Sequence, residues 1–379
     1  MPKRNLPLFR VNMPENVHLA LQPVLESGFV SEGPRSKEFQ EKLQEWLGNP
    51  YTATVNSGTM ALTLAYRMAG ARPGTKVIAS PMTCLASTEP AQGLGAEVVW
   101  CDIDPKTGNL NPRKLAQLLA DHPNVVAVSF TDWAGTPCEL DNIIATCKSY
   151  GVKTIEDAAH SFGARYNGNK VGSLATGIDY TCFSFQAIKH MTTVDGGALA
   201  CANKEDFDRA VLLRWFGCAR GHNSSPVKWS GDVTEYGYKG HMNDVNATIG
   251  LESLKTIDSF IARHKRNGQL LTELLADVPN VETLEVPPHI DSAYWIFTIK
   301  LLDSEHRKRV SDGLTAAGIG HNIVHTRNDS YSLFSGSSSS PTMAGMSDFA
   351  ERMLSVPCGW WLDEDDVRFI AQTLKEVSE

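Results

Sequence analysis

The sequence has no paired cysteines and no long apolar run. Its cysteines stand singly, so neither a zinc site nor a disulfide framework is predicted. No apolar stretch reaches the roughly 18 residues of a membrane-spanning helix, and the first residues lack the apolar segment of a signal peptide. We therefore expect a cytoplasmic protein with no membrane partner and no bound metal, whose cysteines act mostly as small buried apolar residues.

The sequence also lacks a basic run. Its formal net charge is −8, which argues against nucleic acid as a partner. No G-x-G-x-x-G motif follows the first predicted strand, so a nicotinamide dehydrogenase is disfavoured. Hydrophobic residues make up 42% and charged residues 21%, as in an ordinary globular protein.

Short apolar segments alternate with helical patterns through the first part of the chain. This alternation predicts an α/β fold with a mostly parallel sheet covered by helices on both faces. The predicted helices lie near residues 35–48, 60–65, 84–93, 112–120 and 140–150, and the predicted strands near 53–55, 77–79, 98–100, 125–128 and 154–155.

The alternation of short apolar segments with helical patterns ends near residue 250. A long helical stretch over 243–275, a strand over 294–299 and a helix over 304–317 predict a smaller α+β domain. For 379 residues we therefore expect a large domain over 1–250 and a small domain over 251–379. By composition, Ser335 to Ser340 is a flexible loop.

Lys189 carries the most chemical information. It follows the apolar stretch Phe183-Ser184-Phe185 and precedes hydroxyl residues and the pair Gly196-Gly197. A lysine in apolar surroundings loses its proton more easily and can act as an amine nucleophile, and Ser184 can offer a hydroxyl to a phosphate. A Schiff-base site for pyridoxal phosphate needs these groups, whereas a lone loop lysine is usually just solvated.

A second segment suits the phosphate of the same cofactor. Asn56-Ser57-Gly58-Thr59 lies between a predicted strand and a predicted helix. Free N–H groups and the helix dipole favour an anion there. The alternative is that Ser57 or Thr59 only caps the helix.

A third segment places acids at the end of a buried strand, where ligands bind in parallel sheets. Asp157 can hold a pyridine nitrogen protonated, and strand alternation turns Glu156 to the opposite face. Alternatively, Asp157 caps a following helix. His160 can contact the ring or be a structural histidine.

Five segments, in order, resemble the DegT/DnrJ/StrS sugar aminotransferases, which are fold-type I pyridoxal phosphate enzymes. They are Gly28–Pro34, Asn56–Leu62, Glu156–Ala164, Phe183–Gly197 and Tyr238–Gly250. The resemblance implies that Lys189 bonds the cofactor and shuttles a proton, and that Asp157 pairs with the pyridine nitrogen. It further implies a homodimer with shared active sites and the following cofactor-binding residues: Ser57, Gly58, Thr59, Cys84, His160, Ser184 and, reaching into the partner subunit, Lys239.

The departures from the family pattern also carry expectations. Cys84 occupies the position that usually stacks a bulky side chain on the ring, so we expect no aromatic stack there. Lys239 stands where many members have asparagine, but it still suits a phosphate across a subunit interface.

The resemblance implies amino transfer from glutamate to a keto sugar, linked to a nucleotide, with the cofactor passing through pyridoxamine 5′-phosphate. Candidate substrate residues are Trp133, Arg220, His222, His325, Arg327 and Trp361. The alternatives are a sugar dehydratase of the same fold and a non-catalytic homologue. Such dehydratases have histidine in place of the lysine; here Lys189 is present, and His190 is one position out of register.

Overall fold

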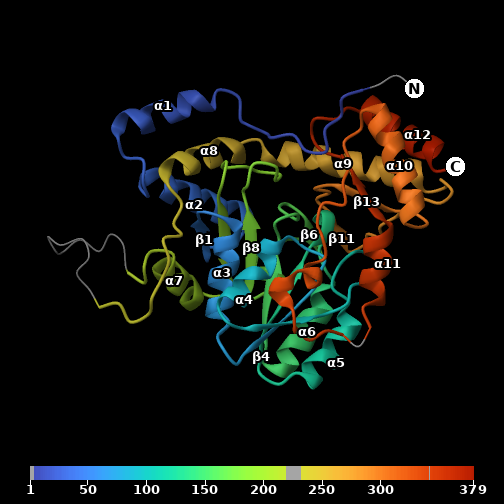
Figure 1. Ribbon diagram of the computed structural model, residues 1–379. Helices are drawn as coiled ribbons and strands as arrows, with labels where there is room; N and C mark the ends of the chain where they lie inside the picture. The colour runs from blue at the N-terminus through green and yellow to red at the C-terminus, as the bar shows by residue number, and fades with distance from the viewer. Residues whose placement is uncertain (1–3, 219–231, 341) are drawn as a thin grey trace.

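The computed structural model describes residues 4–218, 232–340 and 342–379, and its centre is a seven-stranded sheet (Figure 1). Neighbours from β3 to β8 are parallel, whereas β9 is antiparallel to both β8 and β1. The predicted α/β class and mostly parallel sheet are therefore confirmed. In spatial order the strands are β1 (Thr52–Val55), β9 (Gly197–Cys201), β8 (Tyr180–Ser184), β5 (Lys153–Asp157), β4 (Val125–Thr131), β2 (Lys76–Ala79) and β3 (Glu97–Trp100).

Both faces of this sheet are buried, because successive residues of a strand point to opposite sides. Val77 and Ala79 of β2 enter one apolar core, and Ile78 between them enters another. The first core includes α3 (Gly58–Met68), α4 (Glu89–Gly93) and α7 (Lys204–Leu213), and the second includes α5 (Pro112–Asp121) and α6 (Leu140–Tyr150). A third core lies between the sheet and α2 (Pro34–Leu47), α8 (Asp244–Leu254) and α9 (Ile257–Leu275).

The C-terminal part has its own core around a three-stranded antiparallel sheet. Leu6 from the N-terminal segment joins this core, and Arg4 forms an ion pair of 2.6 Å with Asp366. The sheet is β10 (Glu282–Thr283), β12 (Phe297–Lys300) and β13 (Met353–Val356), packed by α10 (Ser304–Ala317), α12 (Glu364–Val377) and the end of α9. The remaining elements are α1 (Val17–Ser27), α11 (Ala344–Arg352) and a small sheet of β11 (Ile290–Asp291), β6 (Arg165–Tyr166) and β7 (Asn169–Lys170). The domain boundary at 250/251, which falls within α8, stays a prediction.

Four predicted elements differ from the structure. The helix near 84–93 is divided at Thr88 into a 3₁₀ turn over Leu85–Ser87 and the short helix α4. The helix over 243–275 is divided as well, because Thr256 leaves the helical conformation between the end of α8 and the start of α9. The strand over 294–299 begins only at Phe297, because Tyr294 has a φ of 47°. The stretch Ser335 to Ser340 is not a free loop, because Ser338 and Ser340 exchange backbone hydrogen bonds of 2.9 and 2.8 Å with Trp100 at the end of β3.

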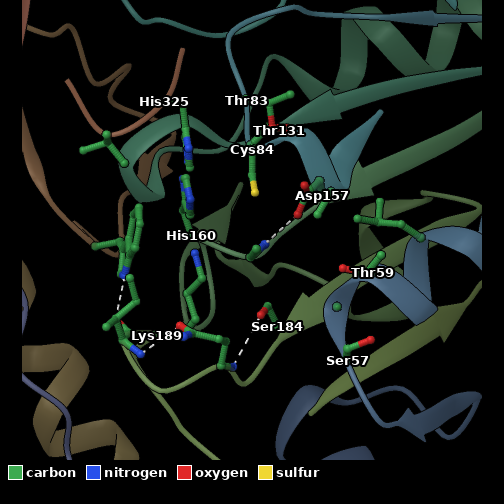
Figure 2. Close-up of a pocket in the computed structure, with 18 of the residues that line it drawn as sticks. Ser57, Thr59, Thr83, Cys84, Thr131, Asp157, His160, Ser184, Lys189 and His325 are labelled. Carbon is green, nitrogen blue, oxygen red and sulfur yellow. Dashed lines mark hydrogen bonds between the residues drawn. The ribbon is translucent and has the colours of Figure 1, made fainter. Parts of the chain in front are cut away.

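The carboxyl ends of β4, β5 and β8 meet the start of α3 at one cavity (Figure 2). This is where ligands bind in open α/β sheets. Across the three described ranges, no helix is both long and apolar enough to cross a membrane.

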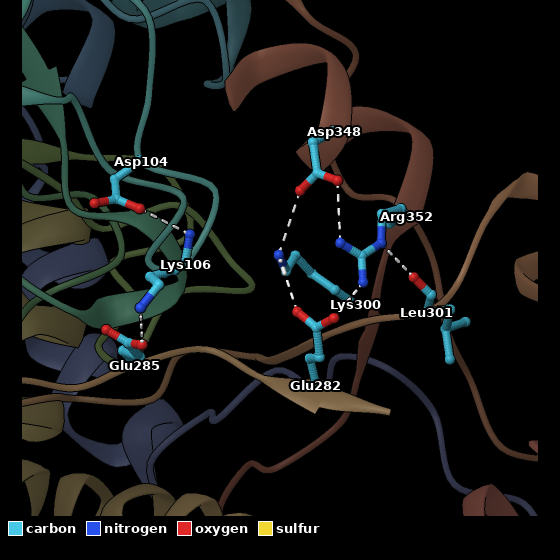
Figure 3. A network of polar contacts seen from close by, with 8 residues as sticks. All are labelled: Asp104, Lys106, Glu282, Glu285, Lys300, Leu301, Asp348 and Arg352. Atoms are coloured by element: carbon cyan, nitrogen blue, oxygen red, sulfur yellow. Dashed lines mark hydrogen bonds and ion pairs between the residues drawn. The ribbon is translucent and has the colours of Figure 1, made fainter. Parts of the chain in front are cut away.

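Away from the cavity, buried Lys300 on β12 joins a network of ion pairs (Figure 3). Its amine lies 3.1 Å from Glu282 and 3.3 Å from Asp348, and Arg352 contacts both acids. Burial acts to raise the pKa of Glu282, but hydrogen bonds from Arg352 and Lys300 outweigh it and hold the pKa below its ordinary value. Lys106 and Glu285, 2.8 Å apart in the same view, are by contrast exposed.

Removing the amine of Lys300 from the buried network should destabilise the protein more than removing the amine of Lys106 from the exposed pair. Lys300→Met should lower the free energy of unfolding at pH 7 by about 1–3 kcal/mol, because it removes hydrogen bonds to two charged groups. Lys106→Met should cause no measurable change, since its pair is solvated. Because the carboxyl pKa values are lowered in the folded state, the contribution of Lys300 is present at neutral pH and disappears as the pH falls below about 4. Urea unfolding of the cofactor-free protein measures this; equal effects of both variants would contradict it.

Candidate active site

The cavity has a volume of about 410 Å³ and collects most of the predicted site residues. Its size lies within the range of small-molecule sites. In Figure 2, Ser57, Thr59 and Ser184 lie on one side and Lys189, His160 and His325 on the other. The predicted residues in its lining are Ser57, Gly58, Thr59, Cys84, Asp157, His160, Ser184, Lys189 and His325.

The hydroxyl side of the cavity is built at the start of α3. Ser57 caps this helix by accepting a hydrogen bond of 3.1 Å from the backbone N–H of Met60, and it also lines the cavity. The first N–H groups of a helix have no acceptor within it. Gly197 lets this end approach the sheet, because a Cβ there would lie 2.7 Å from the nitrogen of Gly58. The result is a set of hydroxyl and amide donors around a helix N-terminus, which suits a phosphate.

Asp157 is held at the end of β5 by two hydrogen bonds. Its Oδ1 accepts from the N–H of Ala159 at 3.1 Å, and its Oδ2 accepts from the Ser87 hydroxyl at 2.5 Å. No helix follows it directly, so the prediction that it caps one is wrong. Burial raises its pKa, against the opposing effect of these hydrogen bonds and of Lys189. A cationic ring at this position would favour the ionised carboxylate.

The Lys189 side chain extends from its loop toward His160 (Figure 2). Burial lowers its pKa to about 8, although nearby Asp157 and Cys84 act to raise it. The amine lies 3.8 Å from the ring centroid of Trp295. A lysine with this pKa has a substantial neutral fraction near neutral pH and can act as a nucleophile.

Two histidines form the wall beside the lysine. The rings of His160 and His325 are parallel within 5°, with centroids 5.5 Å apart. Burial, and then the charge of Lys189, lower both pKa values, that of His325 to about 4. Both are therefore neutral at pH 7. His160 Nδ1 and His325 Nε2 are buried without a hydrogen-bond partner, which leaves them able to bind a polar ligand.

The other predicted site residues lie elsewhere. Trp133 is buried behind the wall, where its ring meets those of His160 and His325 edge-on and its Nε1 donates to Thr298 at 3.2 Å. Arg327 pairs with Asp329 outside the cavity lining. Lys239 is exposed, and its backbone oxygen accepts a hydrogen bond of 3.1 Å from the side chain of Asn56 in the loop before α3. Trp361 bonds Pro7, and Arg220 and His222 lie outside the described residues.

The residues at the site that were missed from sequence include Ser87, Phe9 and Trp295. Ser87 lay in a visibly hydroxyl-rich stretch, Thr83 to Thr88, whose hydrogen bonds reach Asp157. Phe9 and Trp295 line the cavity from distant parts of the chain, and their rings stack with centroids 4.9 Å apart. No local pattern indicates these two, because only the tertiary fold brings them to the cavity.

These groups fit pyridoxal phosphate. The helix N-terminus with its hydroxyls suits the phosphate, and the carboxylate of Asp157 suits the pyridine nitrogen. The buried, unpartnered His160 Nδ1 suits a polar substituent of the ring. Lys189 would form the covalent link.

Comparisons with known proteins agree with this site. Residues 12–375 match the model of the DegT/DnrJ/EryC1/StrS aminotransferase family. The chain is 29% identical to the UDP-4-amino-4,6-dideoxy-N-acetyl-beta-L-altrosamine transaminase of Campylobacter jejuni, over 95% of this chain and 94% of the relative.

Solved structures agree as well. The sugar aminotransferase CalS13 from Micromonospora echinospora has a TM-score of 0.91 at 31% identity, covering 98% of this chain and 99% of that one. AtS13 from Actinomadura melliaura has a TM-score of 0.92 at 32% identity, covering 99% of this chain and all of that one. The family match and the likeness to these structures show that the chain belongs to the DegT/DnrJ/EryC1/StrS aminotransferase family.

Proposed function

We propose that this aminotransferase uses pyridoxal 5′-phosphate to move the amino group of glutamate to a nucleotide-linked keto sugar. The observation that carries the proposal is the meeting of Lys189, Asp157 and the donor-rich start of α3 in one cavity. The family match supports the cofactor, and the sugar substrate follows the printed names of the similar proteins.

When bound, pyridoxal phosphate supplies an aldehyde that bonds amines and a protonated ring that withdraws electrons. Ser57, Gly58, Thr59 and Ser184 would hold the phosphate. The Asp157 carboxylate would hold the proton at the pyridine nitrogen. Lys189 would bond the cofactor, and its free amine would carry a proton between the reacting carbons, a role for which a base with a pKa of about 8 is suited.

His160 and His325 fit the recognition of hydroxyl groups. A neutral imidazole has one nitrogen that donates and one that accepts, and each of these residues has a buried nitrogen without a partner. We assign His160 to the cofactor ring and His325 to the substrate. Trp133 then acts by supporting this wall.

The dehydratase alternative is less well supported. Such an enzyme needs a histidine in place of the lysine, and His190 does not line the cavity. Its Nε2 instead contacts the backbone oxygen of Ala293 at 3.0 Å, and its ring packs against His264. A non-catalytic homologue is also less well supported, because Lys189 and Asp157 are both in place.

We further propose a homodimer in which Lys239 of one subunit reaches the phosphate in its partner. Lys239 is exposed and lies outside the cavity of its own chain. Exposed apolar side chains near the N-terminus, with exposed fractions of 59% for Leu19, 57% for Leu25 and 61% for Phe29, are consistent with a covered surface.

The reaction is tested with purified protein, pyridoxal phosphate, glutamate and a panel of nucleotide-linked keto sugars. We expect one 2-oxoglutarate for each aminated sugar, and no turnover by Lys189→Ala or by Lys189→Arg, which keeps the charge. Borohydride reduction should attach the cofactor to Lys189 of the wild-type protein. Deoxygenated sugar with free ammonia would indicate the dehydratase instead, and a cofactor that glutamate never aminates would exclude this donor.

Asp157→Asn should lower turnover by on the order of 100-fold or more, because the amide cannot keep the ring nitrogen protonated. The matched variant Ser87→Ala keeps the carboxylate and removes one hydrogen bond to it, so we expect about a tenfold loss. Both should retain the thermal midpoint of the wild type to within a few degrees. Near-normal turnover of Asp157→Asn would leave Asp157 only the role of stabilising its turn.

Sedimentation of the loaded enzyme should show a dimer. Lys239→Met should weaken cofactor binding by about tenfold, the loss of one charge-assisted hydrogen bond. Lys148→Met, at an exposed position on α6, is the control and should bind the cofactor like the wild type. A monomer that holds its full complement of cofactor would refute the shared site.

A further inference from the structure

The amino group of Lys189 rests on an aromatic ring. Its Nζ is 3.8 Å from the centroid of the Trp295 ring. Among the described residues this amine has no hydrogen bond and no ion pair, so the contact with the indole is the one that holds it. An ammonium over an indole face is attracted by the ring quadrupole, most strongly where water is excluded.

Trp295 is fixed firmly enough to serve as such a partner. It is 2% exposed, and its Nε1 donates to the backbone oxygen of Ile188 at 2.9 Å, in the loop that carries the lysine. Its backbone N–H donates to the oxygen of Ala134 at 2.8 Å. Gly135 allows this close approach, because a Cβ there would lie 2.8 Å from the nitrogen of Trp295.

The backbone before Trp295 is strained, and two buried histidines contact its carbonyl oxygens. Tyr294 has a φ of 47°, which a tyrosine rarely adopts. His264 Nδ1 contacts the oxygen of Tyr294 at 2.8 Å, and His190 Nε2 contacts the oxygen of Ala293 at 3.0 Å. Strain of this kind persists where the surroundings over-determine the conformation, and it is often found at functional sites.

Other groups around the lysine do not replace the indole. His160 stacks on Trp295, with centroids 3.9 Å apart and planes within 18°, so the histidine braces the ring. The titratable groups whose charges act on Lys189, or on which its charge acts, are Asp157, Cys84, His160, His190 and His325. Burial lowers the pKa values of the three histidines, so they are neutral at pH 7. Asp157 is the only carboxyl group in this set.

We propose that Trp295 is a positioning residue for Lys189, whose indole face holds the amino group whenever that group is not covalently bonded. This inference rests on the proposed role of the lysine. In an amino transfer the lysine gives up its bond in the first half-reaction and regains it only in the second, so its amine is free between the two. A fixed aromatic surface keeps the released amine beside the cavity and oriented toward the reacting atoms. A solvated lysine side chain would instead sample many rotamers.

The test uses cofactor-free protein, so that it does not depend on turnover. The pKa of Lys189 is measured by competitive acetylation over a range of pH values, with the labelled peptide quantified by mass spectrometry. Trp295→Phe keeps an aromatic face, whereas Trp295→Leu removes it. Both variants lose the Nε1–H donor and open space in the same place. Phe9→Leu is the control, because Phe9 lines the cavity and stacks on Trp295 but is not a partner of the lysine.

We expect the Lys189 pKa to be about 0.5 to 1.5 units lower in Trp295→Leu than in Trp295→Phe, because the ammonium loses its aromatic partner. Phe9→Leu should match the wild type. A Leu variant with a pKa equal to or above that of the Phe variant would overturn the proposal. Should Trp295→Leu fail to fold, Trp295→Met, which also lacks a ring, takes its place.

A second measurement separates this inference from the proposed function. Borohydride reduction of the loaded wild-type protein reports whether Lys189 bonds the cofactor at all. Attachment at another lysine would overturn both the assignment of Lys189 and the role of Trp295. Attachment at Lys189 together with equal pKa values in the Phe and Leu variants would overturn the role of Trp295 alone.

Discussion

The site depends on the register of the parallel strands β4, β5 and β8. Thr131 of β4 lies opposite Asp157 of β5, and Asp157 lies opposite Cys182 of β8. Because side chains alternate along a strand, a slip of one residue would turn Asp157 away from the cavity and bring in Glu156. In the observed register Glu156 is fully buried and accepts a hydrogen bond of 2.8 Å from Thr181. Sheet pairing thus selects which of two adjacent acids faces the cavity.

Hydroxyl groups then hold the selected carboxylate in place. Thr83 contacts the hydroxyls of both Ser87 and Thr131, at 2.6 and 2.7 Å, and Ser87 donates to Asp157. This chain connects the end of β4, the loop after β2 and the end of β5. A buried acid with satisfied partners keeps one orientation, so the direction of the Asp157 carboxylate is set before any ligand arrives.

Burial shapes the electrostatics of the whole cavity. It lowers the pKa values of Lys189, His160 and His325 and raises that of Asp157. The same physical cause therefore gives a nucleophilic amine, two neutral imidazoles and a carboxyl group that responds to a cationic partner. Since each effect requires surroundings without water, the packing of the buried rings of Trp133 and Trp295 supports all of them.

The sequence by itself determined the class of the sheet, the helix that follows Ser57 and the chemical roles of Lys189 and Asp157 as hypotheses. These depend on local information: alternation of apolar segments, a cap before a helix, an acid at a strand end. The bounds of α10, Ser304–Ala317, also followed from its own residues. The domain boundary and the role of Lys239 stay predictions.

Only the tertiary structure decided which side chains meet. Trp295 was predicted as part of a strand, but Tyr294 leaves the strand conformation because the segment bonds to Ala134 and Gly135 instead of to a neighbouring strand. Trp133, which looked like a substrate residue, is buried behind His160, and the serine-rich stretch near Ser338 pairs with β3. Long-range backbone hydrogen bonds and core packing decide such outcomes, and neither leaves a pattern within a short window of sequence.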